Sequence, residues 1–198
     1  MNPLLPEIHL IRHGETAWSK SGQHTGRTDL PLTERGERIA RRFADYLRGR
    51  IYAHVFTSPL QRARRTCELA GFNATARIEP DLAEWDYGAY NGLTTAQIHQ
   101  QRPGWRLFRD GCPGGESAAD VGCRSDRLIA HLRSLDGNSL LFSSRDFIRV
   151  FTARWLGLDA SCGRLFLLDT TTLSILGYDH DKSEPIIHLW NDARPGLE

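Results

Sequence analysis

The chain has 198 residues and a formal net charge of +1 at pH 7, with 40% hydrophobic and 25% charged residues. This length is enough for a sizeable buried core, and we expect residues 1–198 to form a single domain. The balanced charge gives no electrostatic reason to expect nucleic acid or a membrane surface as a partner. Any anion-binding site must therefore be local.

The cysteines and the amino terminus exclude further classes of protein. No Cys-x-x-Cys pair is present, which gives no support to a zinc site or a redox motif, so we expect free thiols. We also expect no cofactor. Residues 1–10 have two prolines and no basic region before a short apolar run, unlike a secretory signal. No stretch of the sequence is long enough to span a membrane. These features predict a cytoplasmic protein.

The first predicted element ends in a charged pair. Ile8–Ile11 has the length and β-branched content of a short buried strand, and Gly14 breaks the run. Arg12 and His13 should therefore lie at the carboxyl end of this strand, the edge at which open α/β sheets bind ligands. A guanidinium can hold phosphate or carboxylate while a neutral imidazole attacks it or moves a proton. The pair favours an anionic substrate, although such pairs alone are more often surface features.

A second arginine follows the next predicted strand, Ala53–Thr57. Ser58 is typical of a helix cap, Pro59 of a first helical residue, and Gln61 of the partner in a capping box. Arg62 should therefore lie in the first turn of a helix. Free N–H groups and the helix dipole favour an anion at that place.

Residues 80–92 contain three acidic residues, three aromatic residues and two glycines. This composition predicts an ordered loop that folds over a site. Glu84 lies in it beside Trp85 and Tyr87, and a carboxyl group among aromatic rings can have the raised pKa that a proton donor needs. A second turn-rich loop, Gly111–Ser117, leads into a helix that Ser117 should cap.

The remaining segments continue an alternation of strands and helices. Further helices are predicted over Thr33–Leu47, Thr94–Gln101, Ser117–Leu135 and Phe147–Leu156. Further strands are predicted over Thr75–Ile78, Ser139–Ser143, Leu165–Asp169, Leu173–Tyr178 and Pro185–Trp190. This order predicts an α/β fold, a three-layer α/β/α sandwich whose mostly parallel, open sheet carries helices on both faces.

Several motifs together resemble one known family. They are Arg-His-Gly-Glu-Thr from Arg12, Gly-Gln-His-Thr-Gly-Arg-Thr-Asp from Gly22, and Ser-Pro-Leu-x-Arg-Ala-x-x-Thr from Ser58. The chain is similar to the histidine phosphatase superfamily, the phosphoglycerate mutase-like group, over nearly its whole length. The run Ser19–Gly26 resembles the sugar phosphatase branch. The resemblance implies a phosphoglycerate mutase-like fold and, as substrate, a small phosphate ester such as a sugar phosphate or phosphorylated sugar acid.

The resemblance also implies roles for individual residues. Neutral His13 attacks phosphorus and becomes a phosphohistidine, while Arg12 and Arg62 hold the phosphoryl oxygens. Glu84 protonates the leaving oxygen and then activates water. These four are the expected catalytic residues, and no metal is required because guanidinium groups supply the positive charge. The residues expected to bind the substrate are Arg12, Ser19, Thr25, Gly26, Arg62, Glu84, Ser144 and Arg145.

The chain departs from the family at one point of this implied site. At the end of the strand Ser139–Ser143 the family has Ser-His-Gly-His, whereas this chain reads Ser143-Ser144-Arg145-Asp146. Ser144 thus replaces a second histidine that bonds a phosphoryl oxygen, and losing one such donor typically lowers a rate by about 10²- to 10³-fold. Three interpretations stay open: a slower phosphatase helped by Ser144 and Arg145, a catalytically silent pseudophosphatase that only binds phosphate esters, or an engineered change.

Of the possible activities, we predict hydrolysis of a phosphate monoester, because all four catalytic residues are present. A mutase-type phosphotransferase is a weaker alternative, since the short segments between Arg62 and Glu84 and between Glu84 and Ser139 lack extra enclosing chain. The expected partner is a small-molecule phosphate ester, without nucleic acid or membrane. The sequence leaves the oligomeric state open between monomer and homodimer.

Overall fold

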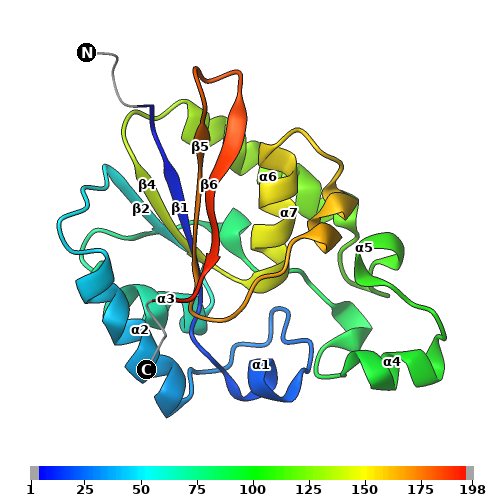
Figure 1. The fold of residues 1–198 in the computed structure, drawn as a ribbon. Helices are drawn as coiled ribbons and strands as arrows, with labels where there is room; N and C mark the ends of the chain where they lie inside the picture. Colours follow the sequence, from blue (N-terminus) through cyan, green and yellow to red (C-terminus); the bar gives the residue numbers. More distant parts are fainter. Residues whose placement is uncertain (1–4, 195–198) are drawn as a thin grey trace.

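The computed structural model describes residues 5–194 and is built on an open sheet of order β3-β2-β4-β1-β5-β6 (Figure 1). The strands are β1 (Ile8–Arg12), β2 (His54–Thr57), β3 (Arg77–Ile78), β4 (Ser139–Ser143), β5 (Leu173–Tyr178) and β6 (Pro185–Asp192). β3, β2, β4 and β1 run parallel, whereas β5 is antiparallel to β1 and to β6. The sheet is mostly parallel, as predicted.

Helices cover both faces of this sheet. The α-helices are α1 (Ala17–Ser21), α2 (Glu34–Tyr46), α3 (Gln61–Leu69), α4 (Thr95–Gln101), α5 (Leu107–Asp110), α6 (Ala118–Arg133) and α7 (Arg145–Trp155). The 3-10 helices are η1 (Pro80–Leu82), η2 (Gly88–Tyr90) and η3 (Ala160–Leu165). In Figure 1, α2 and α3 lie on one side of the sheet and α6 and α7 on the other. The predicted α/β/α sandwich is confirmed.

Alternation along the central strands divides the core into two clusters. Leu10 of β1 and Leu141 of β4 pack in the cluster on the side of α6 and α7, whereas Ile11 and Phe142 pack in the cluster on the side of α2 and α3. Successive strand residues point to opposite faces, so each helical layer covers one row of side chains. All four side chains are almost completely buried, and burial of apolar area is the main stabilising contribution.

Parallel pairing brings the carboxyl ends of β1, β2 and β4 to the same edge of the sheet. The N–H of His13 donates to the carbonyl oxygen of Ser143 at 3.0 Å, and the N–H of Ser58 donates to that of Phe142 at 2.9 Å. The loops that follow these three strands therefore start side by side. This edge lies above α1 in the lower part of Figure 1.

The start of α3 differs from the sequence prediction. The predicted cap at Ser58 is wrong, because the helix begins at Gln61, has Leu60 at its N-cap position and lacks a side-chain cap from that residue. Asp29, in the long first loop, takes this role: its Oδ1 accepts from the N–H of Gln61 at 2.7 Å. A partner distant in sequence has replaced the local capping box. Arg62 still lies in the first turn, as predicted.

Two predicted strands are shortened or absent. The strand expected over Thr75–Ile78 is reduced to the two residues of β3. The strand expected over Leu165–Asp169 is wrong, since Leu165 ends η3 and residues 166–169 have no regular structure. Leu165 and Leu167 are 63% and 65% exposed, so this apolar run does not mark a buried strand. The cap predicted at Ser117 is confirmed, Thr94 caps α4 in the same way, and α6 ends two residues before the predicted Leu135.

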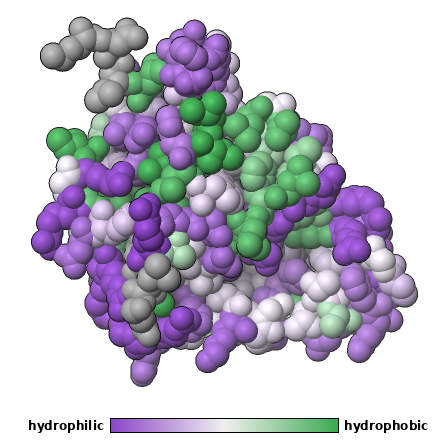
Figure 2. Space-filling view, viewed as in Figure 1, coloured by the Kyte–Doolittle hydropathy of each residue, from purple (hydrophilic) through white to green (hydrophobic). Residues whose placement is uncertain are grey.

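The surface combines hydrophobic and hydrophilic regions. On the face shown in Figure 2, hydrophobic side chains gather over the upper part, around β5 and β6, and hydrophilic ones border them. No helix within residues 5–194 is long and apolar enough to cross a membrane. All four cysteines, Cys67, Cys112, Cys123 and Cys162, are free. The first four residues of the amino-terminal segment lie outside the described residues.

Candidate active site

His13 lies directly after β1, is buried, and has a defined tautomer. Its Nδ1 bonds the carbonyl oxygen of Gly14 at 2.7 Å, and a carbonyl oxygen can only accept, so Nδ1 carries the proton. Nε2 accepts a hydrogen bond from Nε of Arg62 at 3.2 Å. Burial, then the charges of Arg62 and Arg12, hold the pKa of His13 well below its usual 6.5. The imidazole is therefore neutral at pH 7, with Nε2 as its nucleophilic atom.

Arg62 is fully buried, and backbone carbonyl groups hold its guanidinium. Nη1 donates to Thr28 at 2.9 Å and Nη2 donates to Gly26 at 2.7 Å. Gly26 has a φ of +52°, and a Cβ atom there would lie 2.2 Å from Oδ1 of Asn91 and 2.9 Å from Cδ2 of Tyr87, so any other residue would be strained and crowded at this position. Burial lowers the pKa of Arg62, and the negative charge of Glu84 offsets only part of this effect. The guanidinium remains a cation in this held position.

Arg12 is the last residue of β1 and is also buried. Its Nη1 donates to the carbonyl oxygen of Leu168 at 2.6 Å, whereas its Nε has no hydrogen-bond partner within residues 5–194. Burial, and then repulsion by Arg145, lower the pKa of Arg12 to about 10, so the side chain is still charged at pH 7. A buried N–H without a partner is costly, and an anion against it would remove that cost.

Glu84 lies in the loop after η1, and its carboxyl group faces the start of α7. Its Oε1 accepts from the N–H groups of Trp85 and Phe147, both at 2.9 Å, and from that of Asp146 at 3.2 Å. Burial and the negative charge of Asp146 raise the pKa of Glu84, while Arg62 and two of these N–H groups oppose the rise. A buried carboxyl group with a raised pKa fits a proton donor.

Asp146 links Glu84 to Tyr87 and Arg149, because its N–H donates to Glu84 and its carboxylate accepts from the other two side chains. Its Oδ2 accepts from the hydroxyl of Tyr87, and its Oδ1 accepts from Nη1 of Arg149 at 2.6 Å. Burial acts to raise the pKa of Asp146, but the charges of Arg149 and Arg145 and these hydrogen bonds outweigh it and lower the pKa. Asp146 therefore stays ionised next to Glu84.

Ser144 occupies the N-cap position of α7 but does not cap the helix with its side chain. Its hydroxyl is fully buried and has no partner in the described part of the chain. Arg12 lies opposite Ser143 in the parallel pairing of β1 and β4, so Arg12 and Ser144 belong to the same sheet edge. Two buried donors without partners therefore lie at the edge that carries His13.

A cavity of about 110 Å³ opens onto these side chains. The predicted site residues that line it are Arg12, His13, Ser19, Thr25, Arg62, Glu84 and Arg145. Gly26 and Ser144 are not among the lining residues. Gly26 acts on Arg62 through its carbonyl group, and Ser144 is fully buried after β4. Ser19 has a second role, because its hydroxyl accepts from the N–H of Thr16 in the capping box of α1.

Sequence reasoning missed part of this cavity. The unpredicted lining residues are Trp18, Gly22, Gln23, His24, Tyr87, Thr95 and Asp146. The His24 ring lies 4.6 Å from that of Tyr87, and its Nε2 is 3.2 Å from Oγ1 of Thr95. His24 directly precedes the predicted Thr25 in the motif Gly-Gln-His-Thr-Gly-Arg-Thr-Asp, so its position in the sequence could have indicated that it lines the cavity. Thr95 follows 71 positions later, and nothing local indicates its place.

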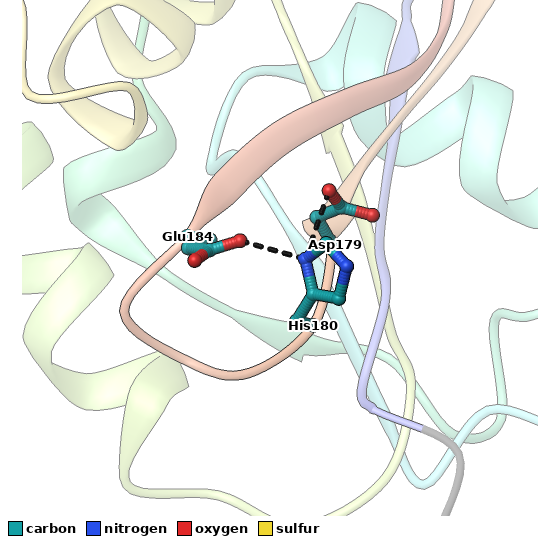
Figure 3. Close-up of side chains that lie close together, drawn as sticks. All are labelled: Asp179, His180 and Glu184. Atoms are coloured by element: carbon teal, nitrogen blue, oxygen red, sulfur yellow. Dashed lines mark hydrogen bonds and ion pairs between the residues drawn. The ribbon is translucent and has the colours of Figure 1, made fainter.

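A group of side chains that could hold a metal lies elsewhere in the fold. Figure 3 shows Asp179, His180 and Glu184 in the turn between β5 and β6. All three are exposed, and both carboxylates contact the same Nδ1 of His180, at 3.1 and 2.9 Å. The contacts with Glu184 and then Asp179 raise the pKa of His180. Since β5 runs antiparallel to β1, this turn is at the opposite end of the sheet from His13.

A sandwich of this topology, with a cavity lined by three arginines where its parallel strands end, defines an α/β protein with a candidate anion-binding site. The chain belongs to the histidine phosphatase superfamily, since the model of branch 1 of that superfamily matches residues 8–193. The family predicted from the sequence is therefore confirmed.

Known relatives agree with this assignment. An acid phosphatase of Mycobacterium tuberculosis is 40% identical over 176 residues, which cover 86% of this chain and 86% of the relative. A sedoheptulose 1,7-bisphosphatase of Saccharomyces cerevisiae is 36% identical, with 80% of this chain and 70% of the relative covered. The solved structure of an open reading frame of M. tuberculosis has a TM-score of 0.88 at 36% identity, covering 94% of this chain and 97% of that one. Relatives named as phosphatases agree with the expected phosphoric monoester hydrolase.

Proposed function

We propose that this protein hydrolyses a small phosphate monoester, a sugar phosphate or a phosphorylated sugar acid, through a phosphohistidine at His13. One observation carries the proposal. The neutral His13 shares its sheet edge with two buried donors that lack partners within residues 5–194, Nε of Arg12 and the hydroxyl of Ser144. A phosphoryl group bound there would meet a nucleophile together with groups that stabilise its negative charge.

In the first half of the reaction, Nε of Arg62 moves from Nε2 of His13 to a phosphoryl oxygen, which frees the lone pair for in-line attack on phosphorus. Nε of Arg12, which lines the cavity, donates to a second phosphoryl oxygen. The N–P bond forms as the P–O bond to the leaving group breaks. Protonated Glu84 then gives its proton to the departing alkoxide.

In the second half, the ionised Glu84 takes a proton from a water molecule that attacks phosphorus. The N–P bond breaks, inorganic phosphate forms, and His13 returns to its neutral state. The same carboxyl group thus serves both steps. Because Arg12 and Arg62 are held by the carbonyl groups of Leu168, Thr28 and Gly26, their charge is in place before the substrate binds.

The substrate class rests on two further observations. Ser19 and Thr25, from the run that resembles the sugar phosphatase branch, line the cavity. The yeast relative is named a sedoheptulose 1,7-bisphosphatase, which acts on a phosphorylated sugar. A leaving group rich in hydroxyl groups fits a cavity that His24, Gln23 and Thr95 also line.

Turnover of p-nitrophenyl phosphate by the wild type and by His13→Ala tests this function. We expect a measurable wild-type rate, and a fall of at least about 10³-fold in His13→Ala, because the variant has no nucleophile. Protein quenched during turnover should gain the mass of one phosphoryl group in the wild type alone. A wild-type rate equal to that of His13→Ala contradicts the proposal.

A second candidate function is that of a silent phosphate-ester binder, which the serine at position 144 in place of a histidine favours. In that case the wild type binds orthovanadate through His13 but does not turn over p-nitrophenyl phosphate. Ser144→His separates the two functions. A large gain over a measurable wild-type rate supports the slow enzyme, and activity that appears only in Ser144→His supports the binder.

A further inference from the structure

Arg145 is the third cation that lines the cavity, and it lies at the rim. It is the first residue of α7 and its side chain is 45% exposed, whereas Arg12 and Arg62 are buried. The charges that lower the pKa of His13 are those of Arg62 and Arg12. The charge of Arg145 acts instead on Arg12, His24, Tyr87 and Asp146. Because Arg145 lines the cavity and is half exposed while Arg12 and Arg62 are buried, its side chain lies in the outer part of the cavity, into which a leaving group would extend.

The positive charge of Arg145 is only weakly neutralised by its neighbours. Its ion-pair contact is with Asp146, at 4.0 Å. Both oxygens of that carboxylate already have closer partners, Arg149 at 2.6 Å on Oδ1 and the Tyr87 hydroxyl on Oδ2. Arg149, the closer partner, therefore balances most of the charge of Asp146, and Arg145 acts on it from a longer distance. Arg145 keeps its own charge and its hydrogen-bond donors for another group.

A phosphoryl group at His13 does not need this third charge. A phosphate monoester carries between one and two negative charges at pH 7, and the two buried guanidinium groups of Arg12 and Arg62 balance them. Glu84, with its raised pKa, is neutral when it acts as the proton donor. One positive charge then remains at the rim, beside the leaving group.

We propose that Arg145 binds a second anionic group on the leaving group, so that the preferred substrates are phosphate monoesters that also carry a carboxylate or a further phosphate. This inference rests on the proposed hydrolysis at His13 and names the substrate class. A guanidinium holds either anion through two parallel hydrogen bonds. At a half-exposed position away from phosphorus, such a contact contributes to substrate binding and therefore changes KM more than kcat.

The test compares substrates that differ in the second anion. 3-Phosphoglycerate carries a carboxylate, fructose 1,6-bisphosphate carries a second phosphate, and glycerol 3-phosphate carries neither. The measured quantity is the ratio of kcat/KM for each of the first two substrates to kcat/KM for glycerol 3-phosphate. In Arg145→Ala this ratio should fall about tenfold through a rise in KM for the first two substrates, since one charge-assisted contact is lost. Comparing the first two substrates shows whether the rim prefers carboxylate or phosphate.

Arg102→Ala is the matched control. Its side chain is 48% exposed, its ion pair with Asp110 spans 3.7 Å, and it is not among the residues lining the cavity. The substrate ratios should therefore stay at their wild-type values in this variant. Arg145→Lys should retain part of the preference, because lysine keeps the charge without the planar fork.

Two results overturn the inference. In the first, Arg145→Ala lowers kcat/KM equally for glycerol 3-phosphate and for the substrates with a second anion, which assigns Arg145 to the transferred phosphoryl group. In the second, Arg145→Ala lowers kcat/KM for none of the three substrates. Failure of the proposed hydrolysis looks different, since the wild type then turns over none of the three substrates. Calorimetric binding in that case still tests the role of Arg145. Tighter binding of 3-phosphoglycerate than of glycerol 3-phosphate by the wild type, with this difference lost in Arg145→Ala, supports the inference. Equal affinities of the wild type for the two ligands overturn it.

Discussion

Nε of Arg62 donates a hydrogen bond to Nε2 of His13 across 3.2 Å, so the same guanidinium holds the nucleophile and lowers its pKa. In the proposed reaction this donor moves to a phosphoryl oxygen when the substrate arrives. The contact thus keeps the imidazole neutral and oriented until a phosphate group replaces Nε2 as the acceptor.

Arg62→Lys should lower kcat for p-nitrophenyl phosphate by about 10²- to 10³-fold. Lysine keeps the charge, but it cannot contact His13, Thr28 and Gly26 at once, since it lacks the planar fork. Steady-state kinetics measures the effect. Arg65→Lys, on the same helix but 37% exposed and paired with Glu37, is the control and should retain wild-type rates. A lysine at position 62 that supports normal turnover would show that the charge alone matters.

Gly26→Ala should lower activity by more than about tenfold, because the added Cβ meets Oδ1 of Asn91 and displaces the carbonyl group that holds Arg62. Gly49→Ala separates this effect from backbone strain. Gly49 also has a positive φ, +81°, but its Cβ would meet nothing within 4 Å. Each variant should lose about 1–2 kcal/mol of stability from the left-handed conformation. Equal activities of the two variants, measured with p-nitrophenyl phosphate, would contradict this role of Gly26.

Asp146→Asn should shift the alkaline limb of the pH–kcat/KM profile to lower pH. The negative charge of Asp146 raises the pKa of Glu84, so its removal lowers that pKa and the proton donor ionises at a lower pH. The acid limb, which belongs to His13, should stay in place, because the charges acting on His13 are those of Arg62 and Arg12. Rate profiles of the two proteins test this, and a profile that moves at both limbs or at neither is inconsistent with it.

Asp192→Asn should lower the free energy of unfolding at pH 7 by about 1–2 kcal/mol, because the carboxylate accepts hydrogen bonds from Arg194 at 2.8 Å and from Tyr46. Arg194 and Tyr46 lower the pKa of Asp192 to about 2. A lowered folded-state pKa gives stability that is present above the unfolded value, 3.8, and is lost as the pH falls through 2. Urea denaturation at pH 7 and at pH 3 should show the difference shrink, and a constant difference would argue against the linkage.

Local patterns predicted most elements of the fold. The apolar run before Arg12 and His13 indicates a strand that ends at the charged pair, and Ser117 marks the start of α6. Periodicity and caps are properties of neighbouring residues, so a sequence shows them directly. The same reasoning failed for Leu165–Asp169, where the apolar run follows the end of a 3-10 helix without forming a strand, and Leu165 and Leu167 are exposed.

The sequence motifs thus indicated which residue types form the site, but not how those residues are arranged. Contacts across long separations are a different matter: Asp29 caps Gln61 from 32 positions away, and Glu84 accepts from the N–H of Asp146 over 62 positions. Such pairs depend on the parallel register that sets Arg12 opposite Ser143, and a shift by one residue would turn these side chains to the other face. The unpaired Ser144 hydroxyl and the half-exposed Arg145 likewise follow from packing, because burial depends on every element around a residue and not on its neighbours in sequence.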